Sequence, residues 1–311
     1  MAAIAGPGTI VARLVIHRGA RRDPGERHKN ATRAVASMEF SRPVLDVIRA
    51  RTSWRSYSQV PIAADLKQHL LSLINEPVTS PFNSSCKLRW MTMAGVDPSE
   101  KKKIGTYGVI SGAKEFIVGI TQEGDLNALQ HLGYVMERLI LHATDMSLAT
   151  CWLGGTFNRT DVAGLVKMAP GDSIPAITPV GYPTGRRHVV DIVIRVAVKA
   201  KARHPFERVF FDGAFDTPLA RSRAGELELP LEAVRLAPSG KNGQPWRLVV
   251  ERGGSAVHFF NVGGWHIDRG IAACHFDLQA REQGVTGKWR VENPGIAAPA
   301  GIEYVISWIK A

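Results

Sequence analysis

The segment Ala237-Pro238-Ser239-Gly240-Lys241-Asn242-Gly243-Gln244-Pro245-Trp246 combines a helix stop with hydrogen-bonding side chains, directly after the amphipathic run 229–236. Pro238 cannot continue a helical hydrogen-bond ladder and restricts the residue before it, so a loop begins here. Gly240 and Gly243 permit positive φ and close approach of backbone N–H groups to a ligand, while Asn242 and Gln244 supply donors and acceptors. The segment is therefore a candidate binding loop, although an ordinary helix stop before a strand at 246–250 fits the composition equally well.

A second segment, Arg51-Thr52-Ser53-Trp54-Arg55-Ser56-Tyr57, alternates polar side chains. In an extended chain Arg51, Ser53 and Arg55 face the same side. Two guanidinium groups and a hydroxyl on one face suit a phosphate. A solvated basic face produces the same alternation, so this pattern alone leaves both interpretations open.

Together the two segments resemble the flavin-binding motifs of the nitroreductase family, whose members are FMN-dependent oxidoreductases. Arg51, Ser53 and Arg55 match the family's Arg-x-Ser-x-Arg motif, and 238–246 matches its Pro-Ser-x-x-Asn-x-Gln-Pro-Trp loop. The resemblance implies that the first motif, with Thr52, holds the ribityl phosphate of FMN. It implies that the loop lies against the isoalloxazine edge, with contacts from Pro238, Ser239, Gly240, Asn242 and Gln244.

Two further segments are similar to parts of the family's flavin site. Leu153-Gly154-Gly155 resembles the segment at the phosphate and ribityl side, where glycines allow backbone donors to face an anion. Glycines after a helix are also ordinary caps. Lys201 and Arg203 stand where members often place a basic pair on the phosphate, and Arg186 and Arg187 compete for that role.

The wide separation of the two motifs suggests an internal duplication, because ordinary members carry both within the first few dozen residues. Gly133, Leu141, Ala143 and Trp152 recur without a gap at Gly270, Leu278, Ala280 and Trp289. Residues 80–84 also align with 239–243. The alternative is that two amphipathic helices share a few residues by chance.

These patterns predict an α+β, nitroreductase-like fold, with two related halves forming an intramolecular pseudo-dimer around central helices at 133–148 and 270–285. The expected organisation is a basic, disordered tail at 1–37, a first half at 38–203 and a shorter second half at 204–311. We expect strand 303–310 to cross to the other half's sheet. Residues 96–113, with Tyr107, are interpreted as a lid over the flavin or as a plain surface excursion.

Composition limits the other classes of protein. The formal net charge is +11, but much of the excess lies in 1–37, without a nucleic-acid-binding module elsewhere. No apolar stretch approaches the roughly 18 residues of a membrane span. Cys86, Cys151 and Cys274 are far apart and form no metal-binding pattern, so neither a metal site nor a disulfide framework is expected. We therefore expect a cytoplasmic protein with no nucleic-acid or membrane partner.

The predicted function is an FMN-dependent oxidoreductase that moves electrons from NAD(P)H to a nitroaromatic, quinone or similar small-molecule acceptor. No Gly-x-Gly-x-x-Gly follows a strand, so NAD(P)H is expected to visit the flavin transiently. No side chain is assigned as an obligatory catalytic acid, base or nucleophile. A fused pseudo-dimer is expected to act as a monomer with one FMN in the seam between its halves. The alternatives are a flavin-binding or flavin-storage protein without turnover, and a basic scaffold with degenerate motifs.

Overall fold

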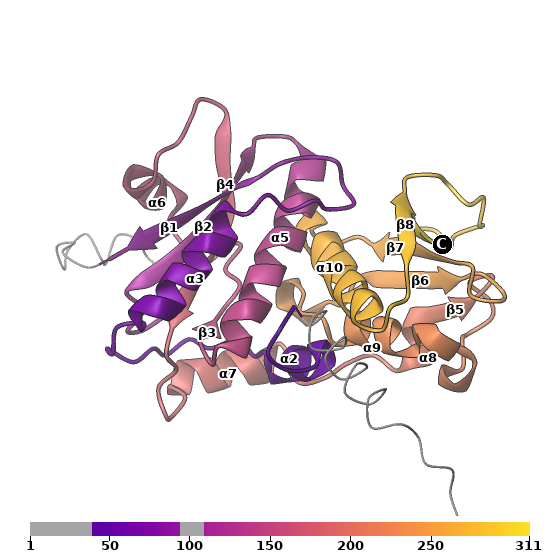
Figure 1. Cartoon of the computed structure of the whole chain (residues 1–311), viewed down its shortest axis with the longest axis horizontal. Helices are drawn as coiled ribbons and strands as arrows, with labels where there is room; N and C mark the ends of the chain where they lie inside the picture. Colours follow the sequence, from indigo (N-terminus) through magenta and orange to yellow (C-terminus); the bar gives the residue numbers. More distant parts are fainter. Residues whose placement is uncertain (1–38, 94–108) are drawn as a thin grey trace, which may run out of the picture. The chain divides into compact units, whose positions relative to one another are not determined.

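The computed structural model describes residues 39–93 and 109–311 (Figure 1). The tail predicted at 1–37 and most of the predicted lid, including Tyr107, lie outside the described residues. The end of the lid segment, from Val109, is described.

The first half builds one antiparallel sheet in the order β1-β2-β4-β3. Its inner strand β2 carries the apolar sequence EFIVGITQ, and six consecutive residues of that strand are buried, as expected for a strand covered on both faces. The elements of this half are, in chain order, α2 (Val44–Ala50), α3 (Ala64–Asn75), β1 (Lys87–Thr92), β2 (Glu115–Gln122), α5 (Leu126–Asp145), β3 (Ala149–Thr150), α6 (Arg159–Leu165), β4 (Asp172–Gly181) and α7 (Val189–Ala197).

The second half builds a sheet in the order β5-β6-β7-β9-β8, in which only the short β5 runs parallel to its neighbour. Its elements are α8 (Phe206–Val209), β5 (Phe210–Asp212), the 3₁₀ turns η1 (Arg221–Arg223) and η2 (Gly225–Leu227), α9 (Glu228–Leu236), η3 (Gly240–Asn242), β6 (Trp246–Val250), β7 (Ala256–Val262), α10 (His266–Glu282), β8 (Gly287–Arg290) and β9 (Ile302–Lys310).

The two sheets have the same topology when β5 is set aside. The order β1-β2-β4-β3 corresponds strand for strand to β6-β7-β9-β8, every pairing in both sets is antiparallel, and one long helix follows the second strand of each. Asn83 and Asn242, at equivalent positions of the two aligned loops, both adopt left-handed backbone angles, with φ of 44° and 58°. The α+β class is thus confirmed; the gene duplication that explains the symmetry stays a prediction.

The prediction that strand 303–310 crosses to the other half's sheet is wrong. β9 pairs with β7 and β8, so it closes the sheet of its own half. β9 pairs with β7 along nearly its whole length and with β8 from Ser307 to Lys310, so its strand partners both belong to the second half.

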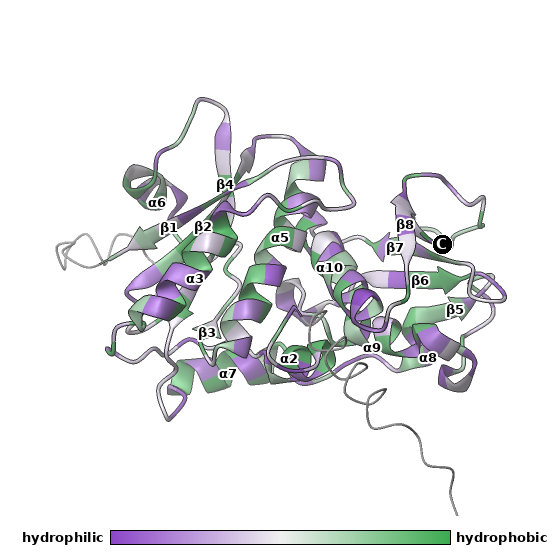
Figure 2. Cartoon of the chain, in the orientation of Figure 1, coloured by the Kyte–Doolittle hydropathy of each residue, from purple (hydrophilic) through white to green (hydrophobic). Residues whose placement is uncertain are grey.

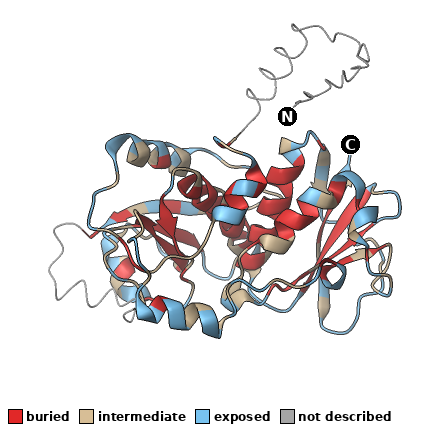
Figure 3. Cartoon of the chain, turned by 90° about the horizontal axis from the view of Figure 1, so that it is seen from below, coloured by how far each residue is buried: buried red, intermediate tan, exposed pale blue. Residues whose placement is uncertain are grey.

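The centre of the fold is the packing of α5 against α10, which lie side by side between the sheets and are buried along most of their length (Figures 1 and 3). A Cβ atom on Gly133 would lie 2.1 Å from the carbonyl oxygen of Ile267, and one on Gly270 would lie 1.9 Å from that of Gln130. Gly133 therefore packs against the backbone of Ile267, one turn before Gly270. In the same way, Gly270 packs against the backbone of Gln130, one turn before Gly133. Only a residue without a side chain permits this approach.

Two buried carboxyl groups also bridge the helix pair near this crossing. Glu137 on α5 accepts a hydrogen bond from Trp152 Nε1 at 2.6 Å and lies 2.9 Å from His275 Nε2 on α10. Asp277 on α10 accepts from Trp289 Nε1 at 3.2 Å and from the hydroxyl of Tyr134 on α5. The aligned tryptophans thus fix two buried carboxyl groups, each of which bonds across the helix pair.

None of the helices in residues 39–93 and 109–311 has the length and apolar character needed to cross a bilayer.

Substituting alanine at the crossing tests this packing. We expect Gly270→Ala to lower the free energy of unfolding by about 3 kcal/mol, because the new methyl group would overlap a backbone oxygen that cannot move alone. Chemical denaturation of the purified protein measures the change. Gly164→Ala is the control, since Gly164 is also helical but has open space around it; it is expected to be neutral or stabilising by up to about 1 kcal/mol. Equal stabilities for the two variants would contradict the crossing.

Candidate functional site

A pocket of about 550 Å³ brings together both sequence motifs. We call it the seam pocket, because residues from both halves line it. The predicted residues that line it are Arg51, Ser53, Arg55, Leu153, Gly154, Gly155, Arg203, Pro238, Ser239, Gly240 and Asn242. Three predicted residues, Thr52, Lys201 and Gln244, do not line it.

The Arg-motif segment is extended, as the alternation predicts. Ser53 forms an isolated parallel bridge with Thr150, and Trp54 donates its backbone N–H to the Thr150 carbonyl at 2.9 Å. This pairing with β3 directs Arg51, Ser53 and Arg55 into the seam pocket, while the intervening Thr52 lines a neighbouring groove.

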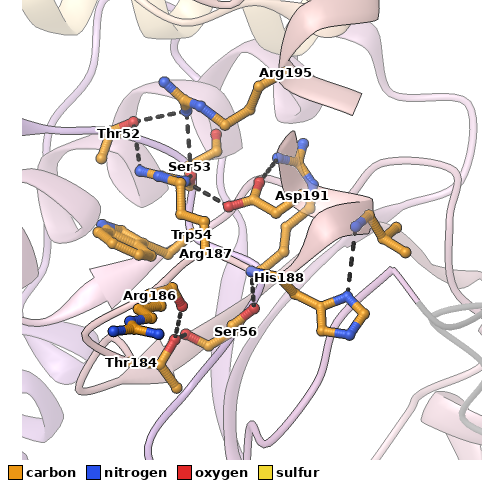
Figure 4. A network of polar contacts seen from close by, with 12 residues as sticks. Thr52, Ser53, Trp54, Ser56, Thr184, Arg186, Arg187, His188, Asp191 and Arg195 are labelled. Atoms are coloured by element: carbon orange, nitrogen blue, oxygen red, sulfur yellow. Dashed lines mark hydrogen bonds and ion pairs between the residues drawn. The ribbon is translucent and has the colours of Figure 1, made fainter. Parts of the chain in front are cut away.

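Helix α7 holds the Arg-motif segment through a network of charged groups (Figure 4). Asp191, fully buried on α7, bonds Arg55 Nη1 at 2.8 Å and Arg187 Nη1 at 2.5 Å. Arg187 also stacks on the ring of Trp54, with 3.8 Å from Cζ to the ring centroid. Arg195, one turn further along α7, donates to Thr52 Oγ1 at 2.8 Å. Arg55 therefore shares the single negative charge of Asp191 with Arg187, whereas Thr52 anchors α7 through Arg195.

The arginine side of the seam pocket holds more positive charge than its carboxylates balance. Arg51 has Glu137 only at 3.9 Å, and Arg195 and Arg203 have no carboxylate within ion-pair distance in the described part of the chain. Arg203 instead donates to carbonyl and amide oxygens, including Leu236 O at 3.1 Å and Asn242 Oδ1 at 3.1 Å.

Two pKa values report the same excess charge. Burial, reinforced by Arg51 and Arg235, lowers the pKa of Arg203 to about 10. Burial and the neighbouring Arg187 lower the pKa of Arg195. An anion bound among these guanidinium groups would relieve both effects.

The Pro-Ser loop lines the seam pocket, but the side-chain amides of Asn242 and Gln244 form hydrogen bonds within the protein. Asn242 Nδ2 donates to Lys199 O at 2.9 Å and Ala202 O at 3.1 Å. Gln244 is buried; its Oε1 accepts from His204 N at 2.8 Å and its Nε2 donates to Asn242 O at 3.2 Å. We expected these two amides to face the flavin; they instead tie the loop to segment 199–204.

Gly154 and Gly155 lie across the pocket from the loop, and Trp265 spans the space between. A Cβ atom on Gly154 would lie 2.5 Å from Trp265 Cζ3, and one on Gly240 would lie 3.6 Å from the same indole. No hydrogen bond within the described residues uses the backbone N–H groups of Gly154 and Gly155. These two donors are therefore available to a ligand, beside a half-exposed aromatic ring.

Asp268, in the first turn of α10, is the one acidic side chain in the described lining of the seam pocket. Its carboxyl group is buried and accepts from the backbone N–H of Gly240 at 3.1 Å. Burial raises its pKa to about 7, against the opposing effect of the Gly240 hydrogen bond. A proton can thus be held or released beside the ligand near neutral pH.

Sequence reasoning missed Trp265, Asp268 and Arg195. Trp265 and Asp268 belong to the start of α10, and only the crossing of α5 and α10 brings that start to the pocket. Arg195 lies in a segment rich in valine and isoleucine that the sequence does not mark as a helix. Trp265 and Asp268 lie just before Gly270, the glycine that aligns with Gly133. The internal repeat is therefore the sequence signal that could have located them.

The buried Asp268 carboxyl predicts a pH dependence of stability. Its folded pKa lies above the unfolded value of 3.8, so its stabilising effect is present below pH 4 and is lost as the pH rises to about 7. Asp268→Asn keeps an oxygen for Gly240 but cannot ionise. Relative to the wild type, its free energy of unfolding is expected to rise by up to about 4 kcal/mol between these pH values. Denaturation curves at several pH values measure the difference; a constant difference would contradict the assignment.

Comparison with known proteins adds the family. The family model described as "Putative TM nitroreductase" matches residues 43–280. A putative nitroreductase of Thermotoga maritima MSB8 is similar in structure, with 18% sequence identity and a TM-score of 0.55, covering 86% of this chain and 94% of that one. No curated protein matches the chain.

Shorter relatives match about half of this chain. A nitroreductase family protein of Clostridium novyi NT is 19% identical with a TM-score of 0.39, covering 49% of this chain and 91% of its own. A putative nitroreductase of Desulfovibrio desulfuricans, solved in complex with FMN, is 22% identical with a TM-score of 0.37, covering 49% of this chain and 95% of its own. Because the family model spans most of the chain, including the Arg motif and the Pro-Ser loop, the protein belongs to the putative TM nitroreductase family of oxidoreductases.

Proposed function

We propose that this protein is an FMN-dependent oxidoreductase that takes electrons from NAD(P)H and passes them to a nitroaromatic, quinone or similar electron-poor acceptor. The observation that carries the proposal is the seam pocket, in which both motifs of the sequence meet. Its arginines gather on the Arg-motif side, and its remaining lining is largely apolar. That division matches a ligand with an anionic tail and a flat ring.

The arginine side of the pocket fits the phosphate of FMN. The Nε atoms of Arg51 and Arg55 are buried and have no hydrogen-bond partner among the described residues. Buried donors of this kind are costly unless a ligand or water satisfies them. Phosphate oxygens would accept hydrogen bonds from both Nε groups. Ser53, on the same extended segment, and the guanidinium group of Arg203 would bind the same phosphate.

The apolar part of the pocket lining fits the flavin ring. Leu153, Ile267 and Ile271 provide an apolar surface, and the indole of Trp265 stands beside it. Among the described residues no group accepts a hydrogen bond from the N–H groups of Gly154 and Gly155, which follow Leu153 in the lining and can donate to the polar edge of the ring. A flat heteroaromatic ring needs both kinds of contact, apolar on its faces and hydrogen-bonding at its edge.

The proposed chemistry follows from these two parts of the pocket lining, one cationic and one apolar. Bound FMN supplies hydride and single-electron transfer. Arg51 and Arg203 hold the negative charge of the cofactor, and the apolar lining limits water beside the ring. The acceptor of hydride also gains a proton, and Asp268 is a carboxyl group in the same pocket that is partly protonated near neutral pH.

The assembly proposed is one chain acting as its own pseudo-dimer, with one FMN per chain. Support comes from the position of the pocket, because segments 51–55 and 153–155 come from the first half and segments 238–242 and 265–271 from the second. The free thiols of Cys86, Cys151 and Cys274 accord with a reducing, cytoplasmic compartment.

The test of the function begins with the visible absorbance spectrum of freshly purified protein, followed by NAD(P)H oxidation with and without an added quinone or nitroaromatic. A flavin spectrum with acceptor-dependent turnover is the expected result. A yellow protein without turnover would indicate a flavin-storage protein. A colourless protein that binds DNA in a salt-sensitive way would indicate the basic scaffold.

Removal of one phosphate contact tests the placement of the cofactor. Arg51→Ala is expected to weaken FMN affinity by about 10- to 100-fold, since a charge-assisted hydrogen bond contributes about 1.5 to 3 kcal/mol. Fluorescence titration of flavin-free protein with FMN measures the affinity. Arg89→Ala, which removes an exposed arginine from β1, is the control. Equal losses in the two variants would mean that net charge, and not the seam pocket, governs binding.

A further inference from the structure

A second cavity, of about 990 Å³, adjoins the seam pocket. We call it the basic groove. It lies between the end of α2 (Ile48 to Ala50), the side of α7 that carries Ile192 and Val196, and segment 199–203. Arg51, Arg195 and Arg203 line both cavities, so charged groups in either cavity lie near the same guanidinium groups.

The lining of the basic groove is strongly cationic. Within the described residues it contains seven arginines and lysines and no aspartate or glutamate: Arg49, Arg51, Arg187, Arg195, Lys199, Lys201 and Arg203. Arg49 lies 3.5 Å from Asp46 on the solvent side, and Arg187 is bound to Asp191. Arg195, Lys199, Lys201 and Arg203 have no carboxylate within ion-pair distance in the described part of the chain. Such a concentration of unbalanced charge favours a multiply charged anion.

The backbone of the groove is built to present these charges. Lys199 has a left-handed backbone with φ of 48°, an angle that non-glycine residues seldom adopt. Its carbonyl is fixed by Asn242 Nδ2 at 2.9 Å. The Pro-Ser loop therefore contacts the turn that carries Lys199 and Lys201.

The groove also offers apolar surface. Ile192 and Val196 are 49% and 72% exposed on α7, a helix that is largely hydrophobic (Figure 2). Together with Leu236 and Ile48 they form an apolar part of the lining. A bare inorganic anion would leave that surface in water, whereas a ligand with a heteroaromatic base as well as phosphates would cover it.

We propose that the basic groove binds the 2′-phosphorylated adenosine end of NADPH, so that NADPH and not NADH is the favoured electron donor. The proposal rests on the proposed function and specifies which electron donor the protein uses. The adenine lies on the exposed apolar side chains of α7. The phosphates lie among Arg49, Lys199 and Lys201, and the chain of the dinucleotide passes the shared arginines toward the seam pocket. Lys201 and Thr52 thereby belong to this groove, and not to the flavin phosphate.

The first experiment uses 2′,5′-ADP as the probe and calorimetry of the purified, flavin-loaded protein as the measurement. The double variant Arg49→Gln/Lys199→Gln removes two groove charges. It is expected to weaken 2′,5′-ADP binding by about tenfold, and 5′-AMP binding by less, because two cations near a phosphate are lost. The charge-matched control Lys167→Gln/Arg290→Gln removes two exposed cations outside the groove and is expected to bind as the wild type does.

The second experiment is kinetic. In the groove variant, the KM for NADPH divided by the KM for NADH is expected to rise about tenfold. The flavin absorbance of the variant is expected to match the wild type. In the control variant the ratio is expected to stay the same.

Three results would overturn the proposal. If the wild type does not bind 2′,5′-ADP, or if the groove variant binds it equally well, the adenosine site lies elsewhere. If the groove variant loses its flavin, the groove holds the phosphate of FMN instead. Failure of the proposed function gives a different result, in which 2′,5′-ADP still binds but neither NADPH nor NADH is oxidised.

Discussion

The contact on which the rest of this structure depends is the crossing of α5 and α10 at Gly133 and Gly270. Each glycine accepts the backbone of the other helix at a distance that excludes any side chain. Two helices this close exclude water from the groups beside them. The buried carboxyl groups of Glu137 and Asp277 are satisfied within the helix pair by Trp152, Trp289, His275 and Tyr134, and Asp277 also pairs with Arg281. Packing and polar pairing specify one register between the halves.

That register also creates the site. Because α10 begins at His266, fixing α10 against α5 places Trp265 and Asp268 opposite Gly154, at the end of the sheet of the first half. Glu137 links the helix crossing to the seam pocket. It accepts a hydrogen bond from Trp152, which precedes Leu153, and it lies 3.9 Å from Arg51. The seam pocket is thus a consequence of how the halves meet. Neither half contains it alone.

Much of this arrangement follows from the sequence where local chemistry is decisive. The helix stop at Pro238 and the buried strand around 116–121 depend on neighbouring residues, and both lie where expected. The repeat from Gly133 to Trp152 and from Gly270 to Trp289 located the helix crossing, because glycine at a close contact leaves a pattern in sequence. The two motifs located the parts of the pocket lining at 51–55 and 238–242.

The features that the sequence did not predict have a common physical cause. Each depends on tertiary contacts with residues far away in the chain. Gln244 and Asn242 carry amides suited to a ligand, but segment 199–204 uses them. Helix α7 consists of residues that favour strands, yet the buried Asp191 fixes it between Arg55 and Arg187. The strand at 303–310 was assigned to the wrong sheet, because pairing partners of strands are set by distant residues.

The most direct test of the central claim, that two fused halves make one flavin site at their seam, is the ratio of FMN to polypeptide in monodisperse protein of known mass. FMN released by denaturation can be measured by absorbance and divided by the chain concentration, with the mass of the native particle from light scattering. The account predicts one FMN per chain in a monomer. Two FMN per chain, or one FMN shared between two chains, would contradict it.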